Sequence, residues 1–297
     1  MKLFVFARAK VNLCLDVFDL RPDGYHEVAS VMQSLALHDV LALEAVPEGI
    51  SLQVTGEAVT AGEENLVLRA ARHLAAATGC RRGAAVTLHK NVPVAAGLGG
   101  GSADAAAVLV GLNSLWRLEC EPGFLAKIGA VLGADVPFCL AGGTALATGR
   151  GEKLTRLPPL PELGVLLLKP PYGLSTAAVY RAFDSARPNH RPVAWRMAEA
   201  LAGGDWREAL QWCSNALEAV AFREHPELAV LKQELQEAGA LCALMSGSGP
   251  TVFGIFATVA EAARAGEFFK RRPLHVIVTN TAAAGVFLGG EKDDGLG

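Results

Sequence analysis

The chain has 297 residues, of which 51% are hydrophobic and 19% are charged. This composition is too apolar for a disordered chain, and the length suffices for one large or two ordinary domains. A net charge of −3 indicates no general affinity for nucleic acid polymers, so an anionic ligand would be held by a few placed groups.

The chain lacks the patterns of an exported or membrane protein. The first residues contain no long apolar segment of a signal peptide, and the longest charge-free stretch, 238–260, is interrupted by "SGSGPT". Its six cysteines, at positions 14, 80, 120, 139, 213 and 242, include no Cys-x-x-Cys pair. We therefore expect a cytoplasmic protein with reduced thiols and no membrane or nucleic acid polymer among its partners.

The first half of the chain reads as strands followed by helices. Short apolar or β-branched runs separated by turn signals such as "RPDG" and "VPEG" predict strands over 2–6, 12–18, 40–46 and 51–56. Helical spacing of apolar residues predicts helices near 64–77 and over 102–115, with a strand at 84–90 before the second helix.

The second half begins after a proline-rich segment, "RLPPLPELG" at 156–164, which is the best candidate boundary. A strand is expected over 164–169, a helix after Asp205 with Glu208 completing its cap, and a helix from Pro226 to Gly239. Strands follow at 251–256 and 274–279, and 291–297 is expected to be a frayed tail. This order is not a regular βαβ alternation, so we predict two α+β domains, 1–157 and 158–297.

The stretch "NVPVAAGLGGGSADAAA" at 91–107 places three glycines directly before an alanine-rich helix. A strand, a glycine-rich loop and a helix N-terminus together form a typical phosphate site, because several backbone N–H groups converge on the anion. The stretch fits neither the P-loop nor the dinucleotide fingerprint, and the chain lacks the H-R-D and D-F-G motifs of protein kinases. The residues alone thus predict a phosphate binder outside these families.

The string P-x-x-x-G-L-G-G-G-S, 93–102, resembles the ATP loop of the galactokinase, homoserine kinase, mevalonate kinase and phosphomevalonate kinase superfamily. "ARAKVNLCLDVFDLRPDGYHEV" at 7–28 and "MSGSGPTVFGIF" at 245–256 resemble two further motifs of that superfamily. "RPDGYHE" and "GADVPFCLAGG" are similar, more narrowly, to the 4-diphosphocytidyl-2-C-methyl-D-erythritol kinases. The resemblance runs from about residue 3 to 256.

This resemblance implies a two-domain α+β small-molecule kinase, with the active site in the cleft between an N-terminal ATP-binding domain and a C-terminal substrate-side domain. The implied reaction is ATP-dependent phosphorylation of the 2-hydroxyl of 4-diphosphocytidyl-2-C-methyl-D-erythritol in the non-mevalonate isoprenoid pathway. It implies ATP and Mg²⁺ as cofactors and, as partner, a small substrate that carries a cytidine diphosphate group. The metal's protein ligands and the oligomeric state stay open.

The resemblance also implies roles for individual residues. Lys10 and Asp135 match the catalytic pair. The residues matched to ATP binding are Asn65, Pro93, Val94, Ala95, Ala96, Gly97, Leu98, Gly99, Gly100, Gly101, Ser102 and Ala103. The residues matched to substrate binding are Asn12, Tyr25, His26, Thr176, Tyr180, Ser246, Gly247 and Ser248.

Each role has a plainer alternative. Lys10 can lie on a solvated strand face, although alternation places it with Asn12 and opposite Val11 and Leu13. Asp135 can cap a turn before a proline, and Asn65 can cap a helix. In the same way, the rings of "RPDGYHE" can cover a hairpin, and "MSGSGPT" can be a tight turn between strands.

Three positions depart from the family pattern. Arg8 stands where a proline is usual, and "NALE" at 215–218 replaces Asn-Asp-Leu-Glu. Ala103 stands where the family usually has a second serine, so the hydroxyl of that serine has no metal or phosphate role here. Two other functions compete with the main one. The first is a mevalonate, homoserine or sugar kinase, and the second is a nucleotide-binding protein without catalysis.

Overall fold

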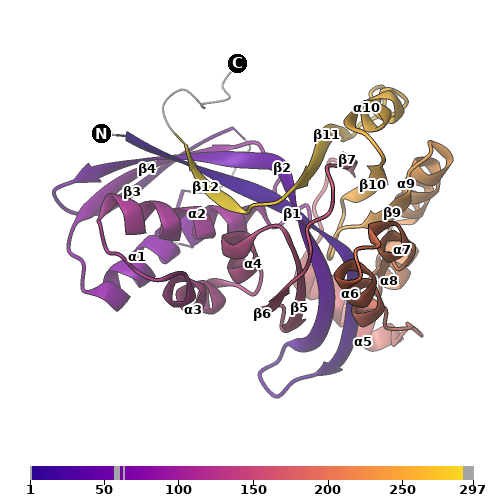
Figure 1. Cartoon of the computed structure of the whole chain (residues 1–297), viewed down its shortest axis with the longest axis horizontal. Coiled ribbons are helices and arrows are strands. Elements are labelled where there is room, and N and C mark those ends of the chain that lie inside the picture. Colours follow the sequence, from indigo (N-terminus) through magenta and orange to yellow (C-terminus); the bar gives the residue numbers. More distant parts are fainter. Residues whose placement is uncertain (1, 57–60, 63, 290–297) are drawn as a thin grey trace.

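The computed structural model describes residues 2–56, 61–62 and 64–289, so the tail predicted at 291–297 lies outside the described residues. It is a mixed α/β structure with strands at both ends of the chain (Figure 1). The elements up to residue 156 are β1 (Lys2–Leu20), β2 (His26–Val46), β3 (Ile50–Gly56), α1 (Leu66–Thr78), β4 (Gly83–Lys90), α2 (Gly100–Leu115), α3 (Pro122–Leu132), α4 (Val136–Ala141), β5 (Thr144–Gly149) and β6 (Lys153–Arg156). Those that follow are β7 (Gly164–Lys169), α5 (Thr176–Ala186), α6 (Ala194–Ala202), α7 (Trp206–Gln211), β8 (Ser214–Asn215), α8 (Glu218–Glu224), α9 (Pro226–Glu237), β9 (Cys242–Met245), β10 (Val252–Phe256), α10 (Val259–Glu267), β11 (His275–Ala282) and β12 (Val286–Gly289).

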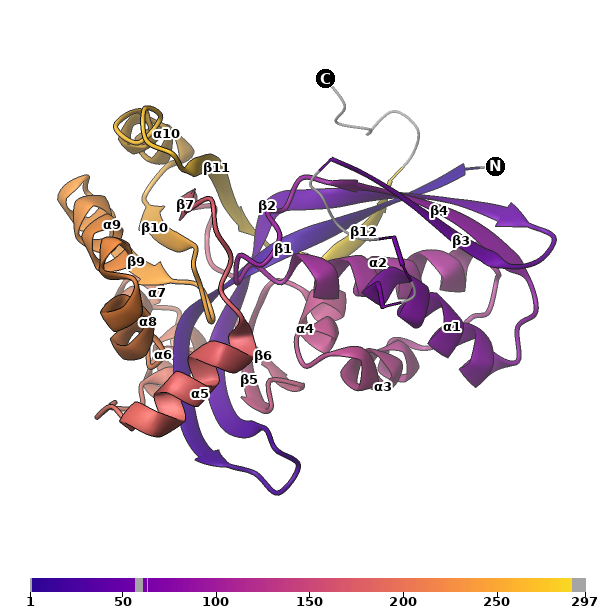
Figure 2. The ribbon, with the colours of Figure 1, turned by 180° about the vertical axis from the view of Figure 1, so that it is seen from behind.

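Two long strands, β1 and β2, run through the molecule as an antiparallel pair (Figures 1 and 2). The sequence patterns divided β1 into two strands and predicted only the last part of β2. Pairing shifts between Arg8 and Lys10 and between Asn12 and Cys14 mark bulges, which break the alternation on which a pattern depends. The start of β2 was missed because its residues are buried on both faces and do not alternate.

A single sheet connects the two halves of the chain. Its main path is β12-β1-β2-β11-β7-β10-β9, with β3, β4, β5, β6 and β8 paired off this path. Strand β11 links the halves because Thr281 pairs with Leu35 of β2 while its earlier residues pair with β7. The chain returns at its end to the first half, where β12 pairs with β1. Figure 1 shows this return as the yellow strand beside β1.

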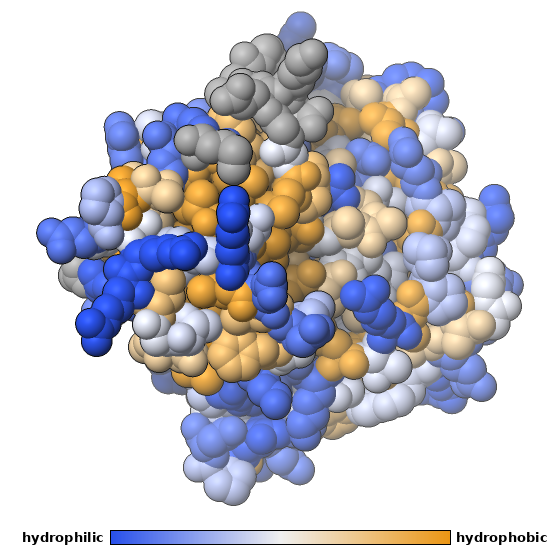
Figure 3. Space-filling view, turned by 60° about the vertical axis from the view of Figure 1, so that its left-hand side comes forward, coloured by the Kyte–Doolittle hydropathy of each residue, from blue (hydrophilic) through white to orange (hydrophobic). Residues whose placement is uncertain are grey.

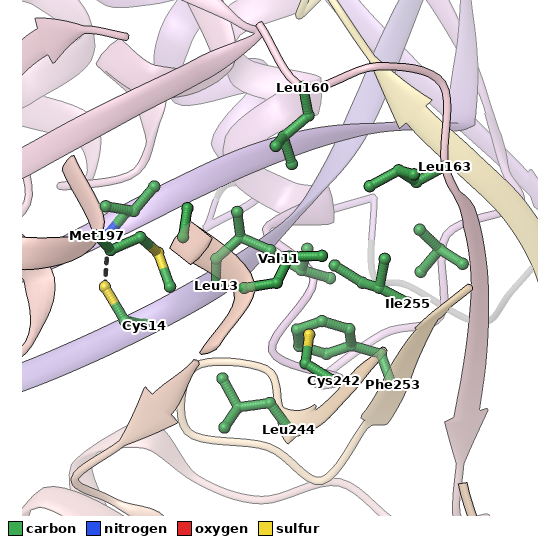
Figure 4. Close-up of a cluster of buried hydrophobic side chains, with 14 of the residues drawn as sticks. Val11, Leu13, Cys14, Leu160, Leu163, Met197, Cys242, Leu244, Phe253 and Ile255 are labelled. Carbon is green, nitrogen blue, oxygen red and sulfur yellow. Dashed lines mark hydrogen bonds between the residues drawn. The ribbon is translucent and has the colours of Figure 1, made fainter. Parts of the chain in front are cut away.

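Helices α1, α2 and α3 cover one face of the sheet in the first half, and helices α8, α9 and α10 pack around the strands of the second (Figures 1 and 2). Helix α2 is buried nearly all round, which explains its small residues: a Cβ on Gly111 would lie 2.8 Å from Val5 Cγ2. A further apolar cluster joins β1 to β9, β10 and α6 (Figure 4). The predicted α+β class is therefore confirmed, although helices α3, α4, α5, α6, α8 and α10 and strands β5, β6, β8 and β12 were not predicted.

The outer surface mixes polar and apolar residues. In Figure 3, hydrophilic side chains border the apolar area visible on this face. None of the helices in the described part of the chain is long and apolar enough to span a membrane.

Candidate active site

Lys10 is buried on β1 beside the glycine-rich loop. Its backbone N–H donates to Leu98 O at 2.9 Å, at the bulge where β1 loses its regular pairing with β2. Its ammonium group donates to Asn12 Oδ1 at 2.7 Å. Figure 4 shows Val11 and Leu13 directed into the apolar cluster, so the predicted alternation is confirmed. With 4% of its surface exposed, Lys10 does not lie on a solvated strand face.

Asp135 directly precedes α4 and faces Lys10. Its side chain makes no cap hydrogen bond to the helix, and Oδ2 lies 3.2 Å from Lys10 Nζ. The carboxylate side chain is 31% exposed, whereas that of Lys10 is 5% exposed. A buried cation therefore holds a carboxylate that stays accessible to an incoming hydroxyl group.

The glycines of the phosphate-type loop permit close packing. A Cβ on Gly99 would lie 2.8 Å from Lys10 Cγ, and one on Gly97 would lie 2.1 Å from Ser246 O. Both residues have positive φ angles, 75° at Gly97 and 70° at Gly99. A Cβ on Gly100 would lie 3.1 Å from Val92 Cγ1, whereas Gly101 is exposed. Three of these glycines are thus needed for contacts inside the protein, and Gly101 leaves the outer side open.

The N-terminus of α2 is suited to an anion. The first backbone bond of the helix is Ala103 N to Gly99 O at 2.9 Å. The N–H groups of Gly100, Gly101 and Ser102 precede it and have no acceptor within the helix. Such groups, together with the helix dipole, attract phosphate oxygens. The side chain of Ala103 points instead into the core, where it is fully buried.

The loop 246–249 joins residues from all three predicted groups. Ser246 Oγ donates to Gly97 O at 2.9 Å, and Ser248 Oγ lies 2.9 Å from Thr176 Oγ1. A Cβ on Gly247 would be 3.3 Å from Asn12 Oδ1 and 3.8 Å from Lys10 Nζ. The glycine-rich loop, the lysine and the start of α5 therefore meet at this loop.

His26 and Tyr180, both predicted to bind a base, lie side by side. Their rings stack with centroids 5.3 Å apart, and His26 Nδ1 donates to Phe18 O at 2.8 Å. His26 Nε2 is buried and, within the described residues, has no hydrogen-bond partner, although Asp184 Oδ1 lies 3.0 Å away. Burial, with a further contribution from the charge of Asp135, raises the pKa of the Tyr180 hydroxyl, which places this ring near the lysine–aspartate pair.

Tyr25 and Asn65 are placed differently from the other predicted residues. Tyr25 lies at the tip of the β1–β2 hairpin, 56% exposed, with the Arg150 guanidinium 5.0 Å from its ring centroid. No ring contact with Tyr180 is found among the described residues. Asn65 caps α1 by accepting from Val67 N at 2.9 Å, so the capping alternative is correct for its side chain. Its adenine contact stays a prediction.

Arg8 contacts β12 and the residues just before it. Its guanidinium carbon lies 4.6 Å from the centroid of the Phe287 ring, and Nη1 donates to Ala284 O at 3.3 Å. Burial lowers the pKa of Arg8. These contacts make Arg8 part of the seam between β1 and β12.

The sequence analysis did not predict a buried ionic group of three side chains that joins α2 to β2 and β4. Lys90 Nζ lies 2.5 Å from Asp39 Oδ2 and 2.8 Å from Asp104 Oδ2. Asp39 Oδ1 accepts from the backbone N–H of Asn91 and Val92, at 2.6 and 2.8 Å, so this carboxylate also fixes the start of the glycine-rich loop. A lysine at the end of a predicted strand and an aspartate inside an alanine helix were the available signals.

A metal site built from the protein alone is not evident. Among residues 2–56, 61–62 and 64–289, no group of three or more His, Cys, Asp or Glu side chains is placed to hold a metal ion. The oxygen donors beside the α2 N-terminus are the partly exposed Ser102 hydroxyl and the Asp135 carboxylate. Two hard oxygen ligands fit Mg²⁺, which keeps waters and takes its other ligands from substrate phosphates.

The fold and this site define a small-molecule kinase of the GHMP type. Residues 65–143 match the family model described as "GHMP kinases N terminal domain", and residues 197–274 match "GHMP kinases C terminal". The crystal structure of a homoserine kinase from Cytophaga hutchinsonii, at 20% identity, covers 97% of each chain with a TM-score of 0.78 and shares the fold.

Closer relatives narrow this class. The chain is 51% identical to the 4-diphosphocytidyl-2-C-methyl-D-erythritol kinase of Pelotomaculum thermopropionicum over 95% of this chain and 98% of that one. It is 46% identical to the same kinase of Moorella thermoacetica, over 93% and 97% of the two chains. A crystal structure of 4-(cytidine 5'-diphospho)-2C-methyl-D-erythritol kinase matches at 37% identity with a TM-score of 0.76, over 98% and 100%. The chain belongs to the 4-diphosphocytidyl-2-C-methyl-D-erythritol kinase family.

Proposed function

We propose that this protein transfers the γ-phosphoryl group of ATP to the 2-hydroxyl of 4-diphosphocytidyl-2-C-methyl-D-erythritol. The observation that carries the proposal is the Lys10–Asp135 pair, 3.2 Å apart, beside the N-terminus of α2. A phosphate site alone also suits a nucleotide-binding protein. A carboxylate held by a buried lysine next to that site suits transfer to an alcohol.

In the proposed mechanism, the free N–H groups of Gly100, Gly101 and Ser102 bind the transferring end of the nucleotide. Asp135 orients the substrate hydroxyl and accepts its proton as the new O–P bond forms. Because the transition state for phosphoryl transfer is loose, the proton moves late and a weakly basic carboxylate suffices. Lys10 holds Asp135 and offsets negative charge on the attacking oxygen and the phosphoryl group.

Mg²⁺ fits the same site: Ser102 would offer it an oxygen ligand while Asp135 faces the substrate hydroxyl, and waters and phosphates would supply the other ligands. When bound, the ion neutralises charge on the phosphates. Asn65 and the loop 93–102 are proposed to hold the remainder of ATP, and Asn12, Thr176 and Ser246–Ser248 the phosphates and polyol of the acceptor. The contacts of loop 246–249 with Gly97, Asn12 and Thr176 support this division.

The base pocket supports a cytidine group. A carbonyl oxygen only accepts hydrogen bonds, so the bond from His26 Nδ1 to Phe18 O requires a proton on Nδ1. In the neutral ring Nε2 is then an acceptor, and Asp184 beside it is another. The amino group of cytosine donates to such a site, whereas the carbonyl of uracil at the same ring position does not. Tyr180, and Tyr25 from the hairpin tip, are proposed to cover the faces of the base.

We also propose that 1–157 and 158–297 act as nucleotide-side and substrate-side domains that meet at this site. The two family matches fall on opposite sides of that boundary, although β1 and β2 are shared by both halves. A cytoplasmic location is proposed with them. All six cysteines lie in the described part of the chain and are free, which supports it.

The deciding experiment measures ADP release with ATP, Mg²⁺ and a panel of acceptors. The panel contains 4-diphosphocytidyl-2-C-methyl-D-erythritol, its uridine analogue, mevalonate, homoserine and galactose. We expect turnover of the cytidine compound and a KM for the uridine analogue at least tenfold higher. Turnover of mevalonate, homoserine or galactose alone would refute the proposal, and turnover of none would favour a non-catalytic nucleotide-binding protein.

A further inference from the structure

Asn215 lies on the short strand β8 and contacts the loop that reaches the catalytic lysine. Its side-chain N–H groups donate to Met245 O at 2.8 Å and to Gly247 O at 2.7 Å. Its Oδ1 accepts from Leu217 N at 2.9 Å, so the buried amide has a partner for each donor and for its oxygen. The amide therefore fixes the carbonyl groups of the two residues on either side of Ser246.

Glu218, three residues after Asn215, holds the same segment by accepting a hydrogen bond from the backbone N–H of Met245. Its Oε1 accepts from Met245 N at 2.8 Å, and Oε2 pairs with Lys232 Nζ at 2.6 Å. Burial raises the pKa of Glu218, and the lysine opposes that rise. Thus the first and last residues of "NALE" bind both backbone groups of Met245. Ala216 between them is buried among apolar side chains.

The segment that carries Asn215 and Glu218 is itself anchored on β1, the strand that carries Lys10. Strand β8 pairs in parallel with β1, Leu15 opposite Asn215, and Ala216 N donates to Leu15 O at 2.9 Å. Gly247, whose carbonyl Asn215 holds, has a φ of 55° and lies against Asn12 and Lys10. A rigid connection therefore runs from β1 through Asn215 to the loop and back to the lysine.

We propose that Asn215 is a positioning residue for phosphoryl transfer, which keeps Gly247 in register with Lys10 and Asn12, with Glu218 as its partner. The inference rests on the proposed function of the site. Without the amide, Gly247 O loses the side-chain donor that Asn215 provides, and the loop no longer fixes the position of the Lys10 ammonium. Misplacement of about 1 Å near reacting groups lowers rates by about 10²-fold.

The test replaces Asn215 with Asp, which keeps the size and the acceptor for Leu217 N but places an oxygen against two carbonyls. Asn113→Asp is a matched control, because Asn113 also clamps one backbone position, donating to Cys120 O at 3.2 Å and accepting from Cys120 N at 2.9 Å. That clamp lies at the far end of α2. Turnover is measured per folded molecule, with the folded fraction from thermal unfolding and the Kd of ATP by direct titration.

We expect Asn215→Asp to lower kcat at least tenfold while the Kd of ATP changes less than threefold, since the side-chain hydrogen bonds of Asn215 go to Met245, Gly247 and Leu217 and not to the α2 N-terminus. Asn113→Asp should leave both unchanged. A normal kcat for folded Asn215→Asp, or an equal loss in Asn113→Asp, would overturn the proposal. If Asn215→Asp does not fold, Asn215→Ser is measured with the same criteria, because it removes the bond to Gly247 O without adding repulsion. Absence of wild-type turnover on the cytidine substrate would instead refute the proposed function.

Discussion

Asp104 allows a direct test of how the ionic group below α2 holds its charges. One ammonium group, Lys90, serves two buried carboxylates. Asp39 accepts two backbone N–H groups besides the lysine, whereas Asp104 Oδ1 is buried without a partner among the described residues. Burial and the charge of Asp39 raise the pKa of Asp104 to about 8, against the opposing effect of Lys90. Asp104 should therefore carry the proton at neutral pH.

The effect on stability has a defined sign. The native pKa is above the value of about 3.9 in an unfolded chain, so the native state binds more protons between these two values. The free energy of unfolding falls as pH rises through this window, by about 1.4 kcal/mol per pH unit, and levels off above the native pKa. Asp104→Asn removes this loss while keeping an oxygen for Lys90. The stability difference between variant and wild type should thus grow by roughly 2 kcal/mol from pH 6 to 7.5.

Urea unfolding, followed by tryptophan fluorescence at half-unit steps from pH 5.5 to 8.5, measures this difference. Asp19→Asn, at an exposed position on the β1–β2 hairpin, is the control for the same Asp-to-Asn change outside the ionic group. If the Asp104→Asn difference is constant across the range, Asp104 is ionised in the native protein. The conclusion that Asp104 carries a proton at neutral pH would then be wrong.

Three further predictions concern the site. Gly99→Ala should lower kcat at least tenfold, because the new methyl group would displace the Lys10 side chain. Gly79 has nearly the same φ, 69° against 70° at Gly99, but a Cβ added there would have no atom within 4 Å, so Gly79→Ala should cost only about 1 kcal/mol of stability. Equal kinetics in the two variants would contradict the packing argument. Asp135→Asn should lower kcat by about 10²–10⁴-fold with little change in the Kd of ATP, and unchanged turnover would remove Asp135 from the mechanism. His26→Ala should raise the KM of the cytidine substrate and not that of ATP; a rise for ATP instead would reverse the placement of the two ligands.

The sequence predicted local features of the site well and tertiary ones only through the resemblance. Alternation placed Lys10 and Asn12 on one face of β1, and the capping alternative for Asn65 followed from its position before a helix. That Asp135 lies beside Lys10 depends on contacts between residues far apart in the chain, which no local pattern encodes. The motif match supplied that pairing.

The glycine-rich loop shows which of its features a local sequence pattern leaves out. Positive φ angles and an open helix N-terminus follow from consecutive glycines before a helix. The contacts of Gly97 with Ser246 and of Gly99 with Lys10 do not, because they depend on segments brought together by folding. Likewise, Asn215 in "NALE" had no predicted role, since its partners follow it by about thirty residues and lie on another strand.

Catalysis and recognition of the base are assigned to different kinds of element in this structure. Lys10 lies on β1 and the glycine-rich loop leads into α2, both largely buried, whereas His26 begins β2 at the hairpin end and Tyr180 lies on α5, whose only buried residue is Val179. A homoserine kinase shares the fold at 20% identity. We expect substitutions of His26 and Tyr180 to alter contacts with the acceptor without disturbing the packing that holds Lys10 and Gly99. Because unrelated activities share one fold, specificity for the cytidine substrate rests in this proposal on His26 and Tyr180 and not on the fold itself.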